Sequence, residues 1–97
     1  MATYIALINW TDQGIKAVKE SPKRADAARQ LARQNGGDLK TLYMVMGKYD
    51  LVGILEAPDD ETYARVVLAL GALGSIRTTS LKAFTEDEYR RIVASLP

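Results

Sequence analysis

The stretch that most constrains the fold is residues 38–57, which holds two β-rich runs separated by a glycine. The first run, 39–46, contains neither Gly nor Pro, and the second, 51–57, stops where a proline follows. Gly47-Lys48 is typical of a two-residue type II′ turn, because glycine adopts a positive φ at no steric cost. The stretch is therefore predicted to form a β-hairpin.

A two-residue loop also fixes which residues face each other across this hairpin. Met44 then lies opposite Leu51, and Leu39 lies opposite Glu56 at the far end. Directly opposed residues share a face of the sheet, and a slip of one residue would exchange the two faces. One predicted face is almost entirely apolar, with Met46, Tyr49, Met44, Leu51, Leu42, Gly53 and Leu55. The other is apolar with some polar groups, and carries Val45, Asp50, Tyr43, Val52, Thr41, Ile54, Leu39 and Glu56.

The residues around the hairpin predict two more strands and three main helices. Residues 3–10 are apolar or aromatic at every position except Thr3 and Asn9, which indicates a strand buried on both faces. Ser21-Pro22 predicts a helix start with Ser21 as N-cap, and Asn35-Gly36-Gly37 predicts its end. The acidic segment 58–61 begins a second helix. Residues 76–84 form the fourth strand, and Thr85 to Glu88 form a capping box before a last helix.

This order of strands and helices is β-α-β-β-α-β-α, which is the ferredoxin-like pattern with an added C-terminal helix. The chain has 97 residues and is expected to be a single α+β domain, 1–97. Because the crossovers are right-handed, both main helices should cover the same face of the sheet. The last helix is short and is expected to cover only an edge or part of the other face. Since that face is apolar too, we expect homo-oligomerisation through it.

Composition excludes several classes of function. The sequence has no His and no Cys, which removes His-based triads, thiolate catalysis and His- or Cys-ligated metals, and no metal or cofactor is expected. A net charge of +1 argues against a nucleic-acid or membrane surface. No apolar run approaches the roughly 20 residues that span a bilayer. With no basic region ahead of an apolar stretch at the N-terminus, a cytoplasmic location is expected.

Several short segments of the chain form a recognisable set: Thr3-Tyr4-Ile5, Thr11 to Ile15, Ser21 to Arg24, Gly47-Lys48-Tyr49-Asp50, Glu56 to Asp60 and Arg77-Thr78-Thr79. Together these segments resemble the GYD domain family. The resemblance covers essentially the whole chain and implies a small bacterial or archaeal protein related in architecture to dimeric α/β barrels. It implies no settled biochemical function, and whether the chain is an enzyme stays open.

Six residues are candidates for contact with a small molecule: Tyr43, Tyr49, Asp50, Arg77, Thr79 and Trp10. Asp50 is the most unusual, because an acid that opens an apolar strand needs a partner if it is buried. Capping of the local turn is the simpler explanation, and a bond to a ligand or to a second subunit is the alternative. Asp59-Asp60-Glu61 is more typical of a helix start than of a cation site.

Three classes of function follow from these candidates. The first is a homo-oligomeric domain that binds a small molecule between its sheet and a partner subunit. The second is a cofactor-independent monooxygenase- or isomerase-like enzyme on a dimeric α/β barrel. The third is a purely structural or regulatory assembly module. In each case the expected protein partner is a second copy of the chain.

Overall fold

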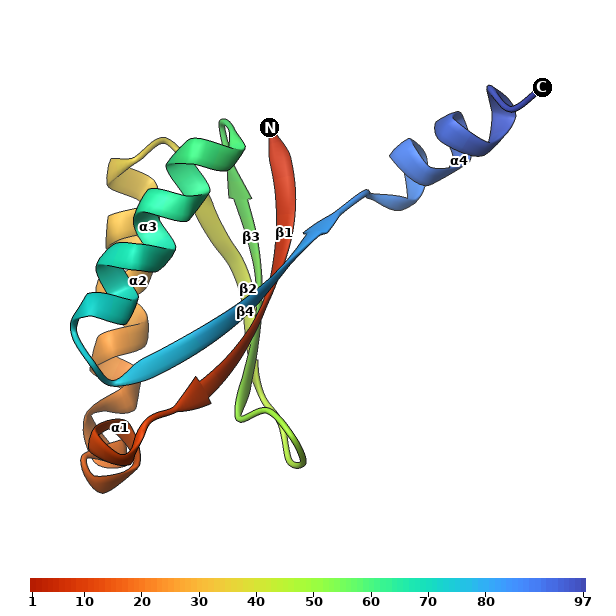
Figure 1. The fold of residues 1–97 in the computed structure, drawn as a ribbon. Helices are drawn as coiled ribbons and strands as arrows, with labels where there is room; N and C mark the ends of the chain where they lie inside the picture. Colours follow the sequence, from red (N-terminus) through yellow and green to blue (C-terminus); the bar gives the residue numbers. More distant parts are fainter.

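A computed structural model describes all 97 residues and confirms the predicted order of elements (Figure 1). The strands are β1 (Ala2–Trp10), β2 (Asp38–Met44), β3 (Leu51–Ala57) and β4 (Ile76–Ala83). The helices are α1 (Asp12–Lys16), η1 (Val18–Glu20, a 3-10 turn), α2 (Ser21–Gln34), α3 (Asp60–Ala72) and α4 (Glu86–Ala94). The fold is α+β with ferredoxin-like topology.

The four strands form one antiparallel sheet in the order β2-β3-β1-β4. Helices α2 and α3 lie side by side on the same face of this sheet, as the right-handed crossovers predict (Figure 1). No helix lies over the other face, which we call the open face. None of the helices combines the length and the hydropathy that crossing a bilayer would need.

The core lies between the sheet and helices α2 and α3, and it is small. Its central cluster consists of Tyr4, Ala6, Leu39, Leu55, Ala57 and Tyr63. Only 11 of the 97 residues are buried, and no large side chain is completely enclosed. Because so little apolar surface is buried, each large side chain in this cluster carries a substantial share of the stability.

The predicted hairpin is present, but its strands are shorter and its loop is longer than expected. The strands end at Met44 and begin again at Leu51, so the loop is not the two-residue turn Gly47-Lys48. Gly47 does have a positive φ, 132°. The last hydrogen bond that holds the loop runs from the Val45 amide to the Asp50 carbonyl, at 2.8 Å.

The predicted register is confirmed near the loop and is wrong at the far end. Met44 lies opposite Leu51, and the pairing continues as predicted as far as Thr41 opposite Ile54. A β-bulge then inserts Lys40, so that Leu39 lies opposite Leu55 instead of Glu56. The extra residue moves Leu39 to the face covered by the helices, where it is 7% exposed.

Ser21 is not the N-cap of α2, contrary to the prediction. The N-cap is Glu20, and no side chain caps the helix there, whereas Pro22 does lie in the first turn. The 3-10 turn η1 leads straight into α2 with helical backbone angles at Ser21 (φ −55°, ψ −43°). No side-chain cap is present, because the residues of η1 directly precede the helix and continue its helical backbone.

Helix α4 covers no part of the sheet, although the sequence predicted cover of an edge or of part of the open face. It follows the end of β4 and projects away from the body of the molecule (Figure 1). Its start is the predicted capping box, in which Thr85 and Glu88 bond each other's backbone amides. Tyr89, Ile92 and Val93 of this helix form an exposed apolar stripe, which continues to Leu96 just after its C-cap Ser95.

Candidate functional site

The open face is a continuous surface built from alternate residues of all four strands. Cross-strand pairing arranges its side chains in rows that run from β2 to β4. One row is Tyr43, Val52, Leu7 and Thr79, and the next is Thr41, Ile54, Ile5 and Leu81. The centre of the face is therefore a block of four aliphatic side chains, and hydroxyl groups lie toward its sides.

Charged side chains border this apolar block at both ends of the sheet. At one end the bulged Lys40 lies 3.5 Å from the Glu56 carboxylate and 4.0 Å from that of Asp38. At the other end Arg77 pairs with Asn9 in register, and the Asn9 amide donates to the Lys48 carbonyl at 2.8 Å. An apolar centre inside a polar border is the usual composition of a protein interface.

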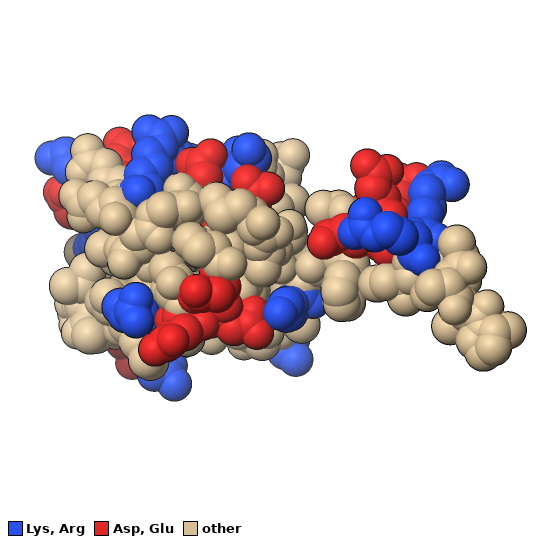
Figure 2. Space-filling model, turned by 90° about the horizontal axis from the view of Figure 1, so that it is seen from above, with Lys and Arg blue, Asp and Glu red and all other residues tan.

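Charges elsewhere on the surface are mixed in sign. Lys and Arg alternate with Asp and Glu over the face seen in Figure 2, and the projecting α4 carries both signs. No group of three or more acidic side chains lies close enough to hold a metal ion. Asp59 caps α3 by accepting a hydrogen bond from the Thr62 amide at 2.8 Å, which is the helix-start arrangement that the sequence favoured.

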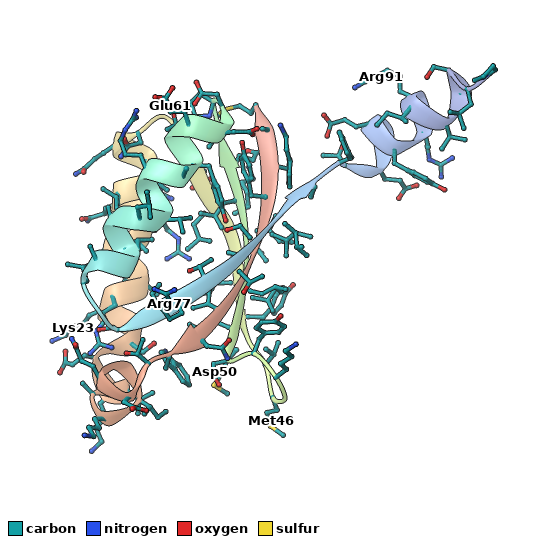
Figure 3. The ribbon with its side chains drawn as sticks, viewed as in Figure 1. Lys23, Met46, Asp50, Glu61, Arg77 and Arg91 are labelled. Atoms are coloured by element: carbon teal, nitrogen blue, oxygen red, sulfur yellow. The ribbon has the colours of Figure 1, made fainter.

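Asp50 takes part in the internal structure of the sheet. Its carboxylate accepts a hydrogen bond from the Trp10 amide at 2.9 Å, and its own amide donates to the Ile8 carbonyl at 2.9 Å. These two bonds continue the pairing of β1 beyond its last partner on β3, Leu51. Asp50 (labelled in Figure 3) therefore finds its partner on the neighbouring strand β1, 40 residues away in the chain, and not in its own turn as the simpler explanation expected.

The other five candidate residues do not form a single cluster. Tyr43, Arg77 and Thr79 belong to the open face, with Tyr43 and Thr79 at opposite ends of one row. Tyr49 lies in the loop after Gly47, with the Lys48 ammonium 5.8 Å from its ring centroid. Trp10 lines a cavity on the helix-covered side of the sheet. Three of the six candidates therefore belong to the open face, but they lie apart on it.

A polar cluster that the sequence analysis missed lies on the helix-covered side. The Tyr4 and Tyr63 rings stack with centroids 3.9 Å apart and nearly parallel planes. The Tyr4 hydroxyl donates to Asp60, whose carboxylate also lies 2.9 Å from the Lys82 ammonium. The Tyr63 hydroxyl is 2.7 Å from the Ser80 hydroxyl. No local sequence signal connects Tyr4 with partners so far along the chain.

We expect ionisation of Tyr4 to destabilise the fold above pH 10. Burial, and then the hydrogen bond to the Asp60 carboxylate, raise the pKa of Tyr4 from 10.0 to about 12. Tyr4 therefore ionises first in the unfolded chain, so its stabilisation is complete below pH 10 and is lost as the pH rises toward 12.

Urea unfolding at pH 9 and at pH 11.5, followed by circular dichroism, measures this loss. Tyr4→Phe should lose less stability than the wild type between the two pH values. Tyr49→Phe is the matched control, because Tyr49 lies in the β2–β3 loop outside the core, and it should behave as the wild type does. Equal losses in Tyr4→Phe and wild type would show that Tyr4 does not control the alkaline transition.

A family profile and a protein of similar sequence both match most of this chain. The GYD domain profile matches residues 4–93. A protein from Thermus thermophilus described as "Glutamine synthetase and cystathionine beta-lyase binding protein" is 38% identical over 84 residues, which is 86% of this chain and 88% of that protein.

Solved structures share the fold. The crystal structure of TTHA0845 from Thermus thermophilus has a TM-score of 0.56 and 26% identity, covering 88% of this chain and 95% of that chain. A feast or famine regulatory protein from M. tuberculosis, complexed with L-methionine, has a TM-score of 0.64 and 16% identity. The match covers 90% of this chain and 54% of that chain, and because the identity is so low, the likeness concerns the fold alone.

Proposed function

Because this chain belongs to the GYD domain family and exposes an apolar sheet face, we propose that it is a self-associating binding module. Two copies pack their open faces together about a two-fold axis to form a dimeric α/β barrel. The observation that supports this most directly is the block of Ile5, Leu7, Val52 and Ile54, which no element of the same chain covers.

The energetic argument rests on what this block gains from a partner. Full burial of an aliphatic side chain is worth about 1.5–3 kcal/mol relative to full exposure. The four side chains are already half-buried by their neighbours, so the remaining gain is on the order of 1 kcal/mol each. Tyr43 and Leu81, which are more exposed, extend the same surface and add to this gain. A small core makes such a contribution important for the stability of the whole chain.

A small molecule bound between the paired sheets is the finer part of this proposal. Tyr43, Thr79 and Arg77 lie at the border of the apolar block and offer hydroxyl and guanidinium groups to a ligand. Paired sheets separated by about 10 Å leave room for a flat molecule where side chains are short. A thermal-shift screen of metabolites, repeated with Arg77→Met, tests whether any ligand depends on this border.

A second candidate function is the binding of metabolic enzymes. It is favoured by the Thermus relative, whose name states that it binds glutamine synthetase and cystathionine β-lyase. The exposed apolar stripe of α4 and the mixed charges around it offer a surface for such contacts (Figure 2). Biolayer interferometry with these two enzymes from the same organism as this chain would detect binding, and a Leu96→Asp/Ile92→Asp variant would test the stripe.

We expect the purified wild-type protein to be a dimer or a larger oligomer at micromolar concentration. No helix of the same chain covers the open face, so it should pack against the open face of a second copy under these conditions. Otherwise its apolar block would be in contact with water. Size-exclusion chromatography with light scattering measures the mass directly against the 10.7 kDa chain. A monomer at this concentration would overturn the proposed self-association.

A further inference from the structure

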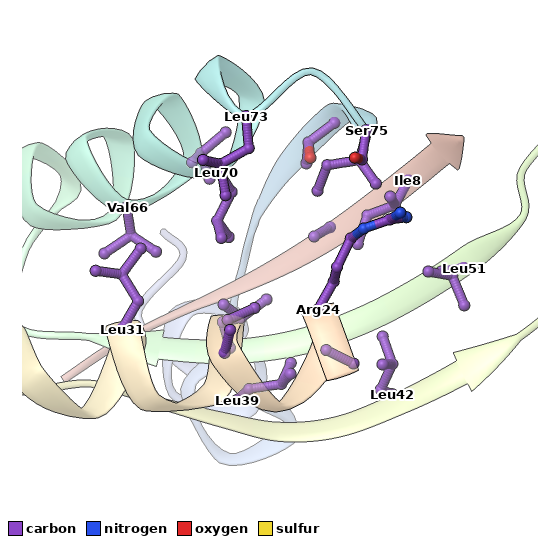
Figure 4. A pocket seen from close by; sticks show the side chains of 18 of the residues that line it. Ile8, Arg24, Leu31, Leu39, Leu42, Leu51, Val66, Leu70, Leu73 and Ser75 are labelled. Carbon is purple, nitrogen blue, oxygen red and sulfur yellow. The ribbon is translucent and has the colours of Figure 1, made fainter. Parts of the chain in front are cut away.

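A cavity of about 350 Å³ lies between α2, α3 and the helix-covered face of the sheet. It occupies the end of the molecule where β1 ends and β4 begins (Figure 4). Its walls are largely aliphatic, and they include Ile8, Leu31, Leu42, Leu51, Leu70 and Ile76. This volume is at the lower end of the range of about 300–1,000 Å³ that small-molecule sites occupy.

Arg24 is the one charged residue among those that line this cavity. Its side chain extends from the first turns of α2, and Figure 4 shows the guanidinium on the same side as Ser75 and Ile8. One terminal nitrogen, Nη2, donates to the Ala17 carbonyl at 3.2 Å. The other, Nη1, is buried and has no hydrogen-bond partner. No Asp or Glu lines the cavity to neutralise this charge.

An unpaired guanidinium N–H group beside an aliphatic cavity is an unfavourable arrangement in an empty site. A buried donor without an acceptor loses its hydration and gains nothing in return. A carboxylate oxygen placed at Nη1 would supply both the missing acceptor and the missing negative charge. The Ser21, Ser75 and Thr78 residues among the lining are further polar neighbours for such a group.

We propose that this cavity binds a small monocarboxylic acid with an apolar body. The carboxylate pairs with Nη1 of Arg24, and the aliphatic or aromatic part of the ligand lies among Leu31, Leu70 and Ile8. A single cation in an otherwise uncharged lining matches one negative charge. The cavity and the open face lie on opposite sides of the sheet, so this inference does not depend on self-association.

Octanoate is a suitable probe, with octanol and octylammonium as ligands of matched chain length and different charge. Isothermal titration calorimetry with the wild-type protein should show that octanoate binds most tightly, octanol more weakly and octylammonium weakest of all. Arg24→Met should weaken octanoate by at least tenfold and leave octanol unchanged. Retained octanol binding shows that the cavity of the variant is still folded.

Two further variants test the location and the specificity of the site. Ala28→Leu adds volume to the cavity wall and should weaken octanoate and octanol alike. Arg33→Met is the matched control on the same helix, because Arg33 lies outside the cavity and pairs with Asp38 at 3.5 Å. It should bind octanoate as the wild type does. Undetectable octanoate binding, equal affinity in Arg24→Met and wild type, or an unchanged affinity in Ala28→Leu would each overturn the proposal.

Discussion

Replacement of both Val52 and Ile54 by lysine is expected to convert the self-associated protein into folded monomers. Both side chains lie at the centre of the open face, adjacent to Leu7 and Ile5 on β1. Pairing two such faces would bring the ammonium groups of both copies into an apolar interface without counter-ions, which is strongly unfavourable. The core lies on the other side of the sheet, so the monomer should keep its secondary structure. Light scattering and far-UV circular dichroism measure the two effects.

The matched control places the same two charges on apolar residues away from the open face. Leu68 on α3 is 72% exposed, and Met46 is 93% exposed. Met46 lies at the tip of the β2–β3 loop (Figure 3). Leu68→Lys/Met46→Lys should therefore have the same mass as the wild type. If the Val52→Lys/Ile54→Lys variant kept the wild-type mass as well, the open face could not be the contact between copies.

Tyr63→Ala is expected to be the most destabilising single substitution in this chain. Tyr63 is 6% exposed, stacks on Tyr4 and belongs to the central cluster of a core that has no completely enclosed large side chain. Loss of a large aromatic side chain from a core costs about 3–5 kcal/mol. A domain of this size has a total stability of about 5–15 kcal/mol. The melting temperature should fall by at least about 10 °C.

Tyr63→Phe separates the ring from its hydroxyl group. This variant keeps the stack on Tyr4 and loses only the hydrogen bond to Ser80. A typical hydrogen bond contributes about 0.5–1.5 kcal/mol, so the change in melting temperature should be several-fold smaller than in Tyr63→Ala. Differential scanning calorimetry of both variants gives the comparison. Equal effects would assign the stabilisation to the hydroxyl, contrary to the packing argument.

The parts of the fold that could be predicted from the sequence are those with local signals. The order of elements followed from hydrophobic periodicity, and the capping box at Thr85 and the hairpin register from Met44 to Thr41 followed from residues close in the chain. The bulge at Lys40 could not be predicted, because the run 39–46 contains no glycine or other residue that marks one. Its effect was to transfer Leu39 from the open face to the core.

The candidate site was predicted less completely, because it depends on contacts between distant residues. The open face and its members Tyr43, Val52 and Ile54 followed from strand alternation in the hairpin. The position of Thr79 and Arg77 on the same face depends on the pairing of β4 with β1, and Trp10 faces the cavity on the other side. The position of Arg24 in the cavity could have been predicted from the sequence. It stands four and seven residues before Ala28 and Leu31, so it is a lone cation on the apolar stripe of its helix.

The projecting helix α4 has a consequence for how assembly and folding are connected. It has nine residues, whereas an isolated helix in water needs about 12–15 to be even marginally stable. The hydrogen bonds and the ion pair of α4 all join residues between Thr85 and the C-terminus, so the rest of the chain contributes little to its helicity. Coverage of the stripe from Tyr89 to Leu96 by another molecule would supply the missing free energy. The helix–coil equilibrium of α4 is then linked to the concentration of whichever molecule covers this stripe.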